Sequence, residues 1–317
     1  MEEIVTHPDV LVLCGGLSPE RDVSIRSGRR VAEALRAEGL SVAVSDVDSQ
    51  LLSQLTEDPP ACVLPLLHGA AGEDGSLGDV LNTLDLAYVG SAPAAARLAF
   101  DKPVAKAIAS GMGLTTPADV ALPHAMFREL GADPLLSAVV ARLGLPLMVK
   151  PAKGGSSLGA STVHAAAELP AAMVGAFAYG DVALVEQFVS GVEIAVGVIE
   201  LDNELVVLPA VEIVPDGGIY DYNARYIAGM TEFFTPARLT QAQTEAAADI
   251  ARAVHAQFGL RDYSRVDLIV SDDEVFFIEA NVAPGMTETS LLPQALSAAG
   301  LTTGGVFAKL VAQAIDR

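Results

Sequence analysis

The stretch FFIEANVAPGMT, from Phe276 to Thr287, begins as an apolar strand and ends in a Pro-Gly turn. Glu279 and Asn281 stand two residues apart immediately before that turn. Alternate residues of a β-strand point to the same face, so we expect this carboxylate and this amide to project side by side. Such a pair either closes a strand or holds a ligand, and the surrounding residues decide between the two.

A second strand directly precedes this stretch. SRVDLIV, residues 264–270, is joined by SDDE to the strand VFFIEAN, a pattern that predicts a β-hairpin. If the faces of the two strands coincide, Asp267, Glu279 and Asn281 form an all-oxygen cluster with Arg265 beside it. Oxygen ligands without His or Cys favour Mg²⁺ or Mn²⁺ over Zn²⁺, and Mg²⁺ often bridges protein carboxylates to nucleotide phosphates. A structural cross-strand ion pair is the alternative, but it explains Asn281 less well.

The composition is that of an acidic globular protein. The chain has 317 residues, 51% of them hydrophobic, which is enough for two or three domains. Its net charge of -21 argues against a nucleic-acid partner, whose phosphates need a basic surface. No apolar run approaches the ~20 residues of a membrane-spanning helix, and the N-terminus lacks the features of a secretory signal. We therefore expect a cytoplasmic protein without membrane contact, in which Cys14 and Cys62 are buried free thiols.

The pattern of apolar residues changes along the chain. The N-terminal region alternates strands and helices, with strands in DVLVLCGG, SVAVSDV and ACVLPLLHG, which is typical of a small parallel sheet. Helical segments then lead to strands with short connections, LPLMVKP, GASTV, VALVEQFV, GVEIAVGVIE and ELVVLPAVEIV, which predict antiparallel pairing. Residues 215–236 show neither the alternation of apolar residues typical of a strand nor the repeat every three to four residues typical of a helix. So long a loop in a compact domain is expected to be a functional lid.

A loop rich in Lys, Gly and Ser is the first candidate for binding an anion. KPAKGGSSLG, residues 150–159, offers ammonium groups, hydroxyls and glycine amides that can hold phosphate oxygens. It lacks the Walker A spacing, and a solvated hairpin turn is the alternative. Four of the five lysines of this acidic chain lie between Lys102 and Lys153, which supports an anion site here only weakly.

Two N-terminal loops hold the other candidates. VLCGGLSPE stands where a dinucleotide-binding loop would, but the G-x-G-x-x-G spacing is missing. In addition, the negative charge of Glu20, in the first turn of the next helix, would repel a pyrophosphate bound at the helix N-terminus. This disfavours a dehydrogenase. A carboxylate there suits a substrate ammonium group, although the helix dipole alone also explains Glu20. His68 follows a parallel strand at the edge where α/β sheets bind ligands, although a lone histidine is more often structural.

Eight motifs in a fixed order together resemble the D-alanine-D-alanine ligase family of the ATP-grasp superfamily. They are GGLSPERDVS, LHGAAGEDG, FDKPVAK, VKPAKGGSSLG, VEQFVSGVEIAV, YDYNARY, SRVDL and IEANVAPGMTETSLLP. The resemblance implies an α/β (α+β) fold of the ATP-grasp type, in which an N-terminal open parallel α/β domain (1–92) precedes two α+β domains (93–189 and 190–317) that hold ATP between antiparallel sheets. It also implies a homodimer that uses ATP, with two Mg²⁺ or Mn²⁺ ions, to join two D-alanine molecules through an acyl phosphate for peptidoglycan synthesis.

The site residues of the family carry over to matching positions of this chain. The resemblance assigns ATP contacts to Lys102, Lys150, Gly154, Gly155, Ser156, Ser157, Glu186, Gln187, Val189, Glu193 and Arg225. It assigns the metal ions to Asp267, Glu279 and Asn281. It places the substrates near Glu20, His68, Tyr220, Tyr226, Arg265, Gly285, Ser290 and Leu291. Catalytic roles fall to Glu20, Ser156, Tyr226, Arg265 and Ser290.

Three positions depart from the usual motifs of the family. Arg225 stands where a lysine usually reaches the γ-phosphate, Gln187 replaces a common lysine near the adenine, and NVAPG lacks a threonine after Asn281. None of them removes a metal ligand. Tyr226 is typical of relatives that form a dipeptide, which favours D-alanine as the second substrate. The alternatives are a related ligase that joins D-alanine to D-serine or D-lactate, or joins another pair of amino acids, and a nucleotide-binding regulatory module without catalysis.

Overall fold

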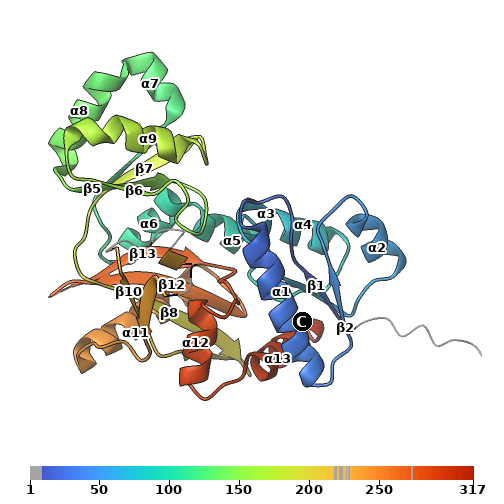
Figure 1. Ribbon diagram of the computed structural model, residues 1–317. Coiled ribbons are helices and arrows are strands. Elements are labelled where there is room, and N and C mark those ends of the chain that lie inside the picture. The colour runs from blue at the N-terminus through green and yellow to red at the C-terminus, as the bar shows by residue number, and fades with distance from the viewer. Residues whose placement is uncertain (1–8, 218–219, 221–223, 226, 228, 273) are drawn as a thin grey trace, which may run out of the picture.

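The computed structural model describes residues 9–217, 220, 224–225, 227, 229–272 and 274–317. Over these ranges the chain forms three sheets (Figure 1). No single helix among them is both long and apolar enough to cross a membrane. One pair of consecutive helices, α12 (Leu291–Ala298) and α13 (Thr303–Ile315), meets the length and composition requirement together, with a bend of 101° between them.

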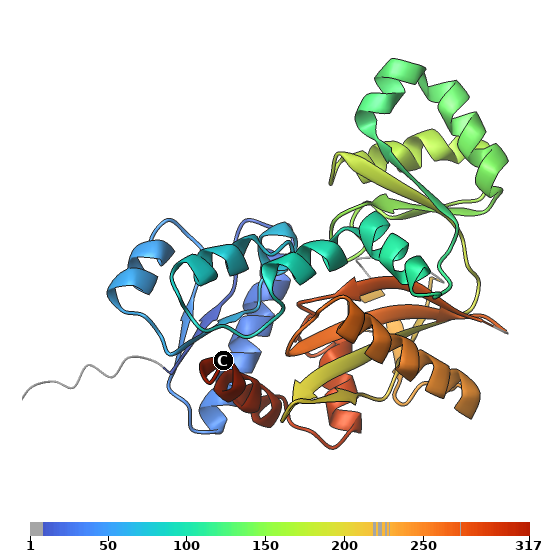
Figure 2. The same cartoon turned by 180° about the vertical axis from the view of Figure 1, so that it is seen from behind.

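The first sheet is small and parallel. The elements of this part are β1 (Val10–Leu13), α1 (Arg21–Ala37), β2 (Val42–Ser45), α2 (Leu51–Glu57), β3 (Cys62–Pro65), α3 (Ala70–Glu73) and α4 (Ser76–Thr83). The strand order is β2-β1-β3, and the central strand β1 is an apolar run that is buried along its whole length, as a covered parallel strand requires. Helix α1 buries Val23, Val31 and Leu35, and the C-terminal helix α13 lies beside it (Figures 1 and 2).

The second sheet is antiparallel and carries its helices on one face. Its strands and helices are β4 (Asp119–Pro123), α7 (His124–Leu130), α8 (Ala132–Leu143), β5 (Leu147–Pro151), β6 (Ser161–Val163), the 3-10 helix η1 (Ala166–Glu168), α9 (Leu169–Phe177) and β7 (Val182–Gln187). The strand order is β4-β7-β5-β6. A separate apolar core, with Leu136, Leu147 and Met173 among its members, fills the space between this sheet and helices α8 and α9.

Helices α5 (Pro93–Phe100) and α6 (Lys102–Gly111) connect the first sheet to the other two (Figure 2). Each of these helices has a proline in its first turn, where the missing amide hydrogen costs nothing. The Asp101 carboxylate accepts a hydrogen bond from the Val104 amide and caps α6. This cap fixes where α6 begins, and therefore the direction in which Lys102 leaves the helix.

The third sheet has six strands, and all its recorded pairings are antiparallel. Its elements are β8 (Val192–Leu201), β9 (Glu204–Val207), β10 (Val211–Pro215), β11 (Thr231–Phe234), α11 (Gln241–Gln257), β12 (Tyr263–Val270), β13 (Val275–Asn281) and the terminal helices α12 and α13. The order is β11-β10-β8-β12-β13, and β9 also pairs with β8. One core joins this sheet to the N-terminal part, since Val12 and Leu35 belong to the same cluster as Ile199 and Phe307. A second core covers the face under α11.

Some elements differ from those expected from the sequence. ELVVLPAVEIV forms two strands, β9 and β10, rather than one, and β4 and α2 were not predicted. Strand β11 lies inside the segment that shows no periodicity, because its partner β10, rather than a local pattern, determines it. The loop after His68 contains the single helical turn α3. The strands β4 and β11 depend on their partners β7 and β10, whereas the turn α3 is closed by local hydrogen bonds from the Glu73 and Asp74 amides to the Gly69 and Ala70 carbonyl oxygens.

Candidate active site

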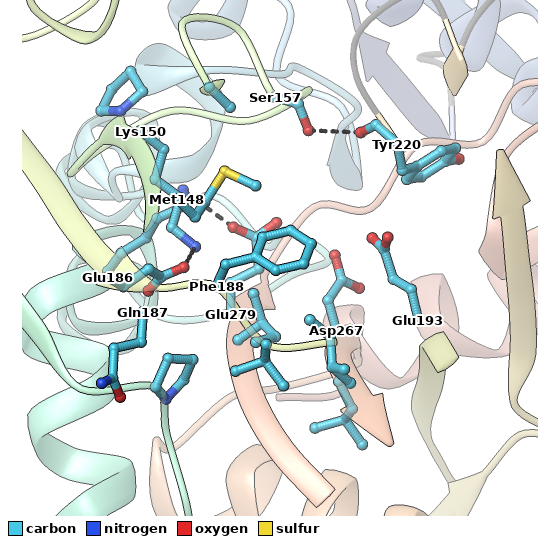
Figure 3. Close-up of a pocket in the computed structure, with 18 of the residues that line it drawn as sticks. Met148, Lys150, Ser157, Glu186, Gln187, Phe188, Glu193, Tyr220, Asp267 and Glu279 are labelled. Carbon is cyan, nitrogen blue, oxygen red and sulfur yellow. Dashed lines mark hydrogen bonds and ion pairs between the residues drawn. The ribbon is translucent and has the colours of Figure 1, made fainter. Parts of the chain in front are cut away.

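A cavity of about 290 Å³ lies between the four-stranded and the six-stranded sheets (Figure 3). Strands β5 and β7 line one side, β12 and β13 line the other, and Met148, Phe188 and Ile278 supply apolar walls. Apolar walls with a few convergent polar groups are typical of nucleotide and small-molecule sites. The following residues assigned to ATP line this cavity: Lys102, Lys150, Gly154, Gly155, Ser157, Glu186, Gln187, Val189, Glu193 and Arg225.

The β12–β13 hairpin brings the oxygen cluster together as the sequence predicts. Asp267 lies opposite Glu279, and Arg265 lies opposite Asn281. The Arg265 guanidinium donates from Nε to Asp267 Oδ1 at 2.7 Å and from its terminal nitrogen to Oδ2 at 2.8 Å. Asn281 Nδ2 donates to Asp267 Oδ2 at 3.3 Å. The structure therefore confirms that β12 and β13 present these polar side chains on the same face of the sheet.

Two lysines supply positive charge beside these carboxylates, Lys102 from the start of α6 and Lys150 from β5. Lys102 Nζ donates to the Gly154 carbonyl oxygen at 2.6 Å and lies 3.2 Å from Glu279 Oε2. Lys150 Nζ lies 2.5 Å from Glu186 Oε1. Burial alone would raise the pKa of Glu279, but Lys102, Lys150 and Arg225 outweigh it and hold that pKa far below its usual value. The carboxylate is therefore ionised, and cations surround the place where phosphates would lie.

The glycine-rich loop connects this cavity to the N-terminal part of the chain. Ser156 and Ser157 have φ angles of +51° and +57°, a conformation that residues other than glycine rarely adopt and that is often found at functional sites. The Ser156 hydroxyl donates to Glu20, which is 4% exposed. A Cβ atom at Gly155 would lie only 2.9 Å from Glu20 Oε1, so a larger residue here would displace the Glu20 carboxylate. Burial raises the pKa of Glu20, although Ser156 and Arg225 partly offset this effect.

Two further buried groups lie near Glu20 in the loop that follows β3. His68 is 5% exposed, its Nε2 lies 3.3 Å from Ser27 Oγ, and burial lowers its pKa to about 4, so the imidazole is neutral. Sequence reasoning missed Glu73, whose carboxylate accepts a hydrogen bond from the Gly69 amide at 3.1 Å. Burial and the neighbouring Glu20 raise the pKa of Glu73 well above its usual value. Its place in the motif LHGAAGEDG was the available signal.

The Pro-Gly turn after β13 leads to the N-terminus of α12. Ser290 stands at the N-cap position of this helix, and its Oγ turns back to accept a hydrogen bond from the Thr287 amide at 2.9 Å rather than from the helix. A Cβ atom at Gly285 would lie 2.8 Å from that oxygen, which explains the glycine. Leu291 begins the helix, whose positive dipole end suits a carboxylate. Thr287, which is 1% exposed and lies 2.9 Å from Ser290 Oγ through its own hydroxyl, was not predicted.

Comparison with known proteins identifies the family. Residues 108–316 match the family model described as D-ala D-ala ligase C-terminus. The chain belongs to the D-alanine-D-alanine ligase family. It is 40% identical over 298 residues to a protein named D-alanine-D-alanine ligase from Anaeromyxobacter dehalogenans, with 94% of each chain covered. It is 38% identical over 305 residues to the protein of that name from Syntrophotalea carbinolica, which covers 96% of this chain and 95% of the relative.

Solved structures agree with this membership of the D-alanine-D-alanine ligase family. The D-alanine-D-alanine ligase of Bacillus anthracis superimposes with a TM-score of 0.81 at 26% identity, over 98% of both chains. The same TM-score is found, at 25% identity, for the Bacillus anthracis enzyme complexed with ATP. The VanG D-Ala:D-Ser ligase of Enterococcus faecalis shares the fold, with a TM-score of 0.81 at 24% identity. The ATP-grasp fold expected from the sequence is thus confirmed.

The positions where the chain departs from the family motifs have their own contacts. Arg225 donates from Nε to Ser157 Oγ at 3.1 Å and to the Tyr220 carbonyl oxygen at 3.3 Å, and its guanidinium carbon lies 4.4 Å from the centroid of the Tyr220 ring. Gln187 donates to the Leu143 carbonyl oxygen at 2.8 Å, so its side-chain amide links the end of β7 to the end of helix α8. Tyr226, assigned to the substrates from the sequence, lies outside the described residues.

Proposed function

We propose that this protein joins two D-alanine molecules into D-alanyl-D-alanine and converts ATP to ADP and phosphate, for the synthesis of peptidoglycan precursors. The observation that supports this most directly is the pairing of two surfaces across one cavity. Lysines and a glycine-rich loop form one surface, and the carboxylate and arginine face of β12 and β13 forms the other. The buried Glu20–Ser156 pair adjoins the same loop.

The nucleotide would lie along the cavity. Lys102, Lys150 and the glycine-rich loop would bind its phosphates, and Glu186 and the main chain at Val189 would bind the adenine. Hydrogen bonds within the described chain use the Phe188 amide, which donates to the Pro146 carbonyl oxygen at 3.1 Å, but not the amide of Val189. Glu193 would accept from the ribose hydroxyls. Burial raises its pKa to about 7, so it would carry a partial charge at neutral pH.

The residues at the hairpin suit Mg²⁺ or Mn²⁺. Asp267, Glu279 and Asn281 offer hard oxygen atoms, whereas the described residues contain no group of three or more His, Cys, Asp or Glu side chains placed to hold a metal by themselves. Mg²⁺ is commonly bound in this way, by one or two carboxylates together with nucleotide phosphates. When bound, the metal neutralises the charge that develops on the transferred phosphoryl group.

The substrates would occupy the end of the cavity near the N-terminal part. Glu20, held by Ser156, would bind the ammonium group of the first D-alanine, near His68. Arg265 carries a permanent charge, since the neighbouring Asp267 outweighs burial and raises its pKa, and it would face the oxygen atoms that become negative. Ser290, the amide of Leu291 and the turn at Gly285 would receive the carboxylate of the second D-alanine.

These positions support a reaction in two steps. A carboxylate is a poor acyl donor, so an oxygen atom of the first D-alanine attacks the γ-phosphorus and ADP leaves. The free amine of the second D-alanine then attacks the carbonyl carbon of the acyl phosphate, the C–N bond forms as the C–O bond to phosphate breaks, and the proton lost by the nitrogen leaves with the phosphate. Residues 215–236 would shield the acyl phosphate from water. We also propose the domains 1–92, 93–189 and 190–317, a cytoplasmic location and a homodimer, all from the family.

An ADP-release assay tests this function. With Mg²⁺ and ATP, we expect D-alanine to stimulate ADP and phosphate release in proportion to the D-alanyl-D-alanine formed. L-alanine should give no product. Parallel assays with D-serine and D-lactate as second substrates measure specificity, because a higher kcat/KM with either one would contradict D-alanine as the second substrate. Release with L-amino acids but not with D-alanine would contradict the proposed function itself.

A further inference from the structure

A lysine that has no role in the proposed reaction lies directly behind the cavity wall. Lys106 is one helical turn beyond Lys102 on α6, so both side chains leave the same face of the helix. It is 2% exposed, and its ammonium donates to the Pro117 carbonyl oxygen at 2.8 Å and to Glu186 Oε2 at 2.7 Å. It also lies 3.2 Å from Asp119 Oδ1. Two hydrogen bonds and one further ion-pair contact therefore surround this buried ammonium group.

The pairing of β4 with β7 explains why a cation is needed at this point. Asp119 lies directly opposite Glu186 in the antiparallel register, and like charges at such positions repel each other. Lys106 separates the two carboxylates. On the other side of Glu186, Lys150 Nζ lies 2.5 Å from Oε1, so each oxygen atom of this carboxylate has its own lysine.

Glu186 is held in one charge state and one orientation by these contacts. The residue is 3% exposed, and burial would raise its pKa, but Lys150 and Lys106 outweigh burial and hold the pKa below its usual value. It also lines the cavity beside Met148 and Phe188, where apolar walls suit a flat ring. An ionised carboxylate can only accept hydrogen bonds.

We propose that Lys106 is a positioning residue that keeps Glu186 an oriented acceptor for the 6-amino group of adenine, and so makes the site select adenine over 6-oxo purine nucleotides. This role assumes the proposed function, because Glu186 meets an adenine only if the cavity binds ATP. A 6-oxo purine presents an acceptor at the same position. Two acceptors then face each other in a buried site. Neither forms a hydrogen bond to replace those it made to water, so the nucleotide binds more weakly.

Loss of Lys106 would have two separable effects. Glu186 would face Asp119 with a single cationic partner, would take up a proton more readily, and could then donate to a 6-oxo group. Lys150 would also be drawn more strongly to Glu186, which would weaken the binding of all nucleotides alike. The ratio of affinities for two bases therefore reports the positioning role, whereas the absolute affinity does not.

The test measures the affinities of ADP and IDP by calorimetry, with Mg²⁺ and the full-length chain. Wild type should prefer ADP by at least about tenfold, and Lys106→Met, which keeps the length of the side chain without its charge, should reduce this preference to within about threefold. Glu186→Gln should do the same, because an amide both donates and accepts. Lys309→Met is the matched control: this lysine pairs with Asp202 on the surface, and its loss should leave the ratio unchanged.

Two results would overturn the proposal. One is a Lys106→Met protein that binds both nucleotides more weakly by the same factor, and the other is a wild type without preference for ADP. Lys106→Gln keeps an uncharged NH₂ group with two donors and should fold even where the methionine variant does not, with an intermediate ratio if the proposal is right and the wild-type ratio if it is wrong. Since binding is measured without D-alanine, a wild type that selects ADP but forms no dipeptide contradicts only the proposed reaction.

Discussion

Asp267 combines two tasks in one side chain. Both of its oxygen atoms accept hydrogen bonds from Arg265, and one of them also accepts from Asn281. The same carboxylate is the proposed metal ligand nearest the centre of the hairpin. Arg265 is 7% exposed, so removal of its partner would leave a buried charge without compensation. Stability and catalysis therefore depend on the same atoms at this position.

We expect Asp267→Asn to lower the free energy of unfolding by roughly 3 kcal/mol, because it breaks a buried ion pair. It should also slow ADP formation at least ~100-fold, because a ligand that helps the metal stabilise the transferred charge is lost. Denaturant unfolding and the ADP-release assay measure the two effects. Asp202→Asn removes an exposed surface pair with Lys309 and should change stability by less than about 1 kcal/mol. Wild-type turnover in Asp267→Asn would remove this residue from the metal site.

His68 makes stability depend on pH. Burial lowers its pKa to about 4, whereas an unfolded histidine titrates near ~6.5, so the unfolded state binds more protons between these values. The contribution of His68 is complete above pH ~6.5 and is lost as the pH falls toward 4, by on the order of 3 kcal/mol. His68→Asn cannot titrate, so its stability relative to wild type should rise on acidification. Denaturant unfolding from pH 8 to pH 4 measures this, with the exposed His124→Asn as control; parallel curves for wild type and His68→Asn would contradict it.

Among the elements, the β12–β13 hairpin was the most predictable from sequence. Alternation placed Arg265 with Asp267 on one strand and Glu279 with Asn281 on the other. The register set by the turn, with Leu268 opposite Phe277, would not align the two pairs, and a one-residue shift between Asp267 and Leu268 is what brings Asp267 opposite Glu279. The same logic failed for β4, which is short and has Pro123 at its end, and for β11, whose only signal is its partner β10. Local patterns predict that a hairpin forms, but they determine neither a register shift within it nor a short edge strand.

Side-chain roles were predictable only where a motif surrounds them. The loop of residues 150–159 is conspicuous in the sequence, and Lys150, Gly154 and Gly155 do line the cavity, whereas Lys153 is exposed and pairs with Asp101. Lys106 resembles any charged residue on a helix, and its importance appears only once β4 places Asp119 opposite Glu186. Val282, which the sequence left without a role, packs in the core beneath α11 together with Ala283.

The contact between the lid segment and the glycine-rich loop depends on Arg225. Lysine at this position would keep the charge but has no planar Nε donor to reach Ser157 and Tyr220 together. We expect Arg225→Lys to raise the KM for ATP by about threefold to tenfold, which corresponds to one or two lost hydrogen bonds. Steady-state kinetics measure this. Ser157→Ala should cause a similar increase, and the double variant should be no worse than Arg225→Lys; fully additive effects would show that the two side chains act independently.

At the scale of the whole molecule, the proposed active site lies where all three sheets meet. The four-stranded sheet supplies Lys150 and Glu186, the six-stranded sheet supplies Asp267 and Glu279, and the N-terminal part supplies Glu20. The N-terminal part and the six-stranded sheet share one core, whereas the four-stranded sheet has its own. A ligand in the cavity therefore links two separately packed units, and its binding should stabilise the chain as a whole.

This arrangement predicts how metal and nucleotide together affect thermal unfolding. ADP at about 100 times its dissociation constant should stabilise the folded chain by about 2.7 kcal/mol in the presence of Mg²⁺, which raises the unfolding temperature by several degrees. EDTA alone should leave the unfolding temperature unchanged, because the described residues hold no cage of protein ligands that would keep a metal without nucleotide. EDTA added with ADP should abolish most of the increase. Lys150→Met should remove most of the increase even with Mg²⁺ present, since Lys150 would contact the phosphates directly. A fall in the unfolding temperature of the nucleotide-free protein on treatment with EDTA would instead indicate a structural metal and would contradict a metal that enters with the nucleotide.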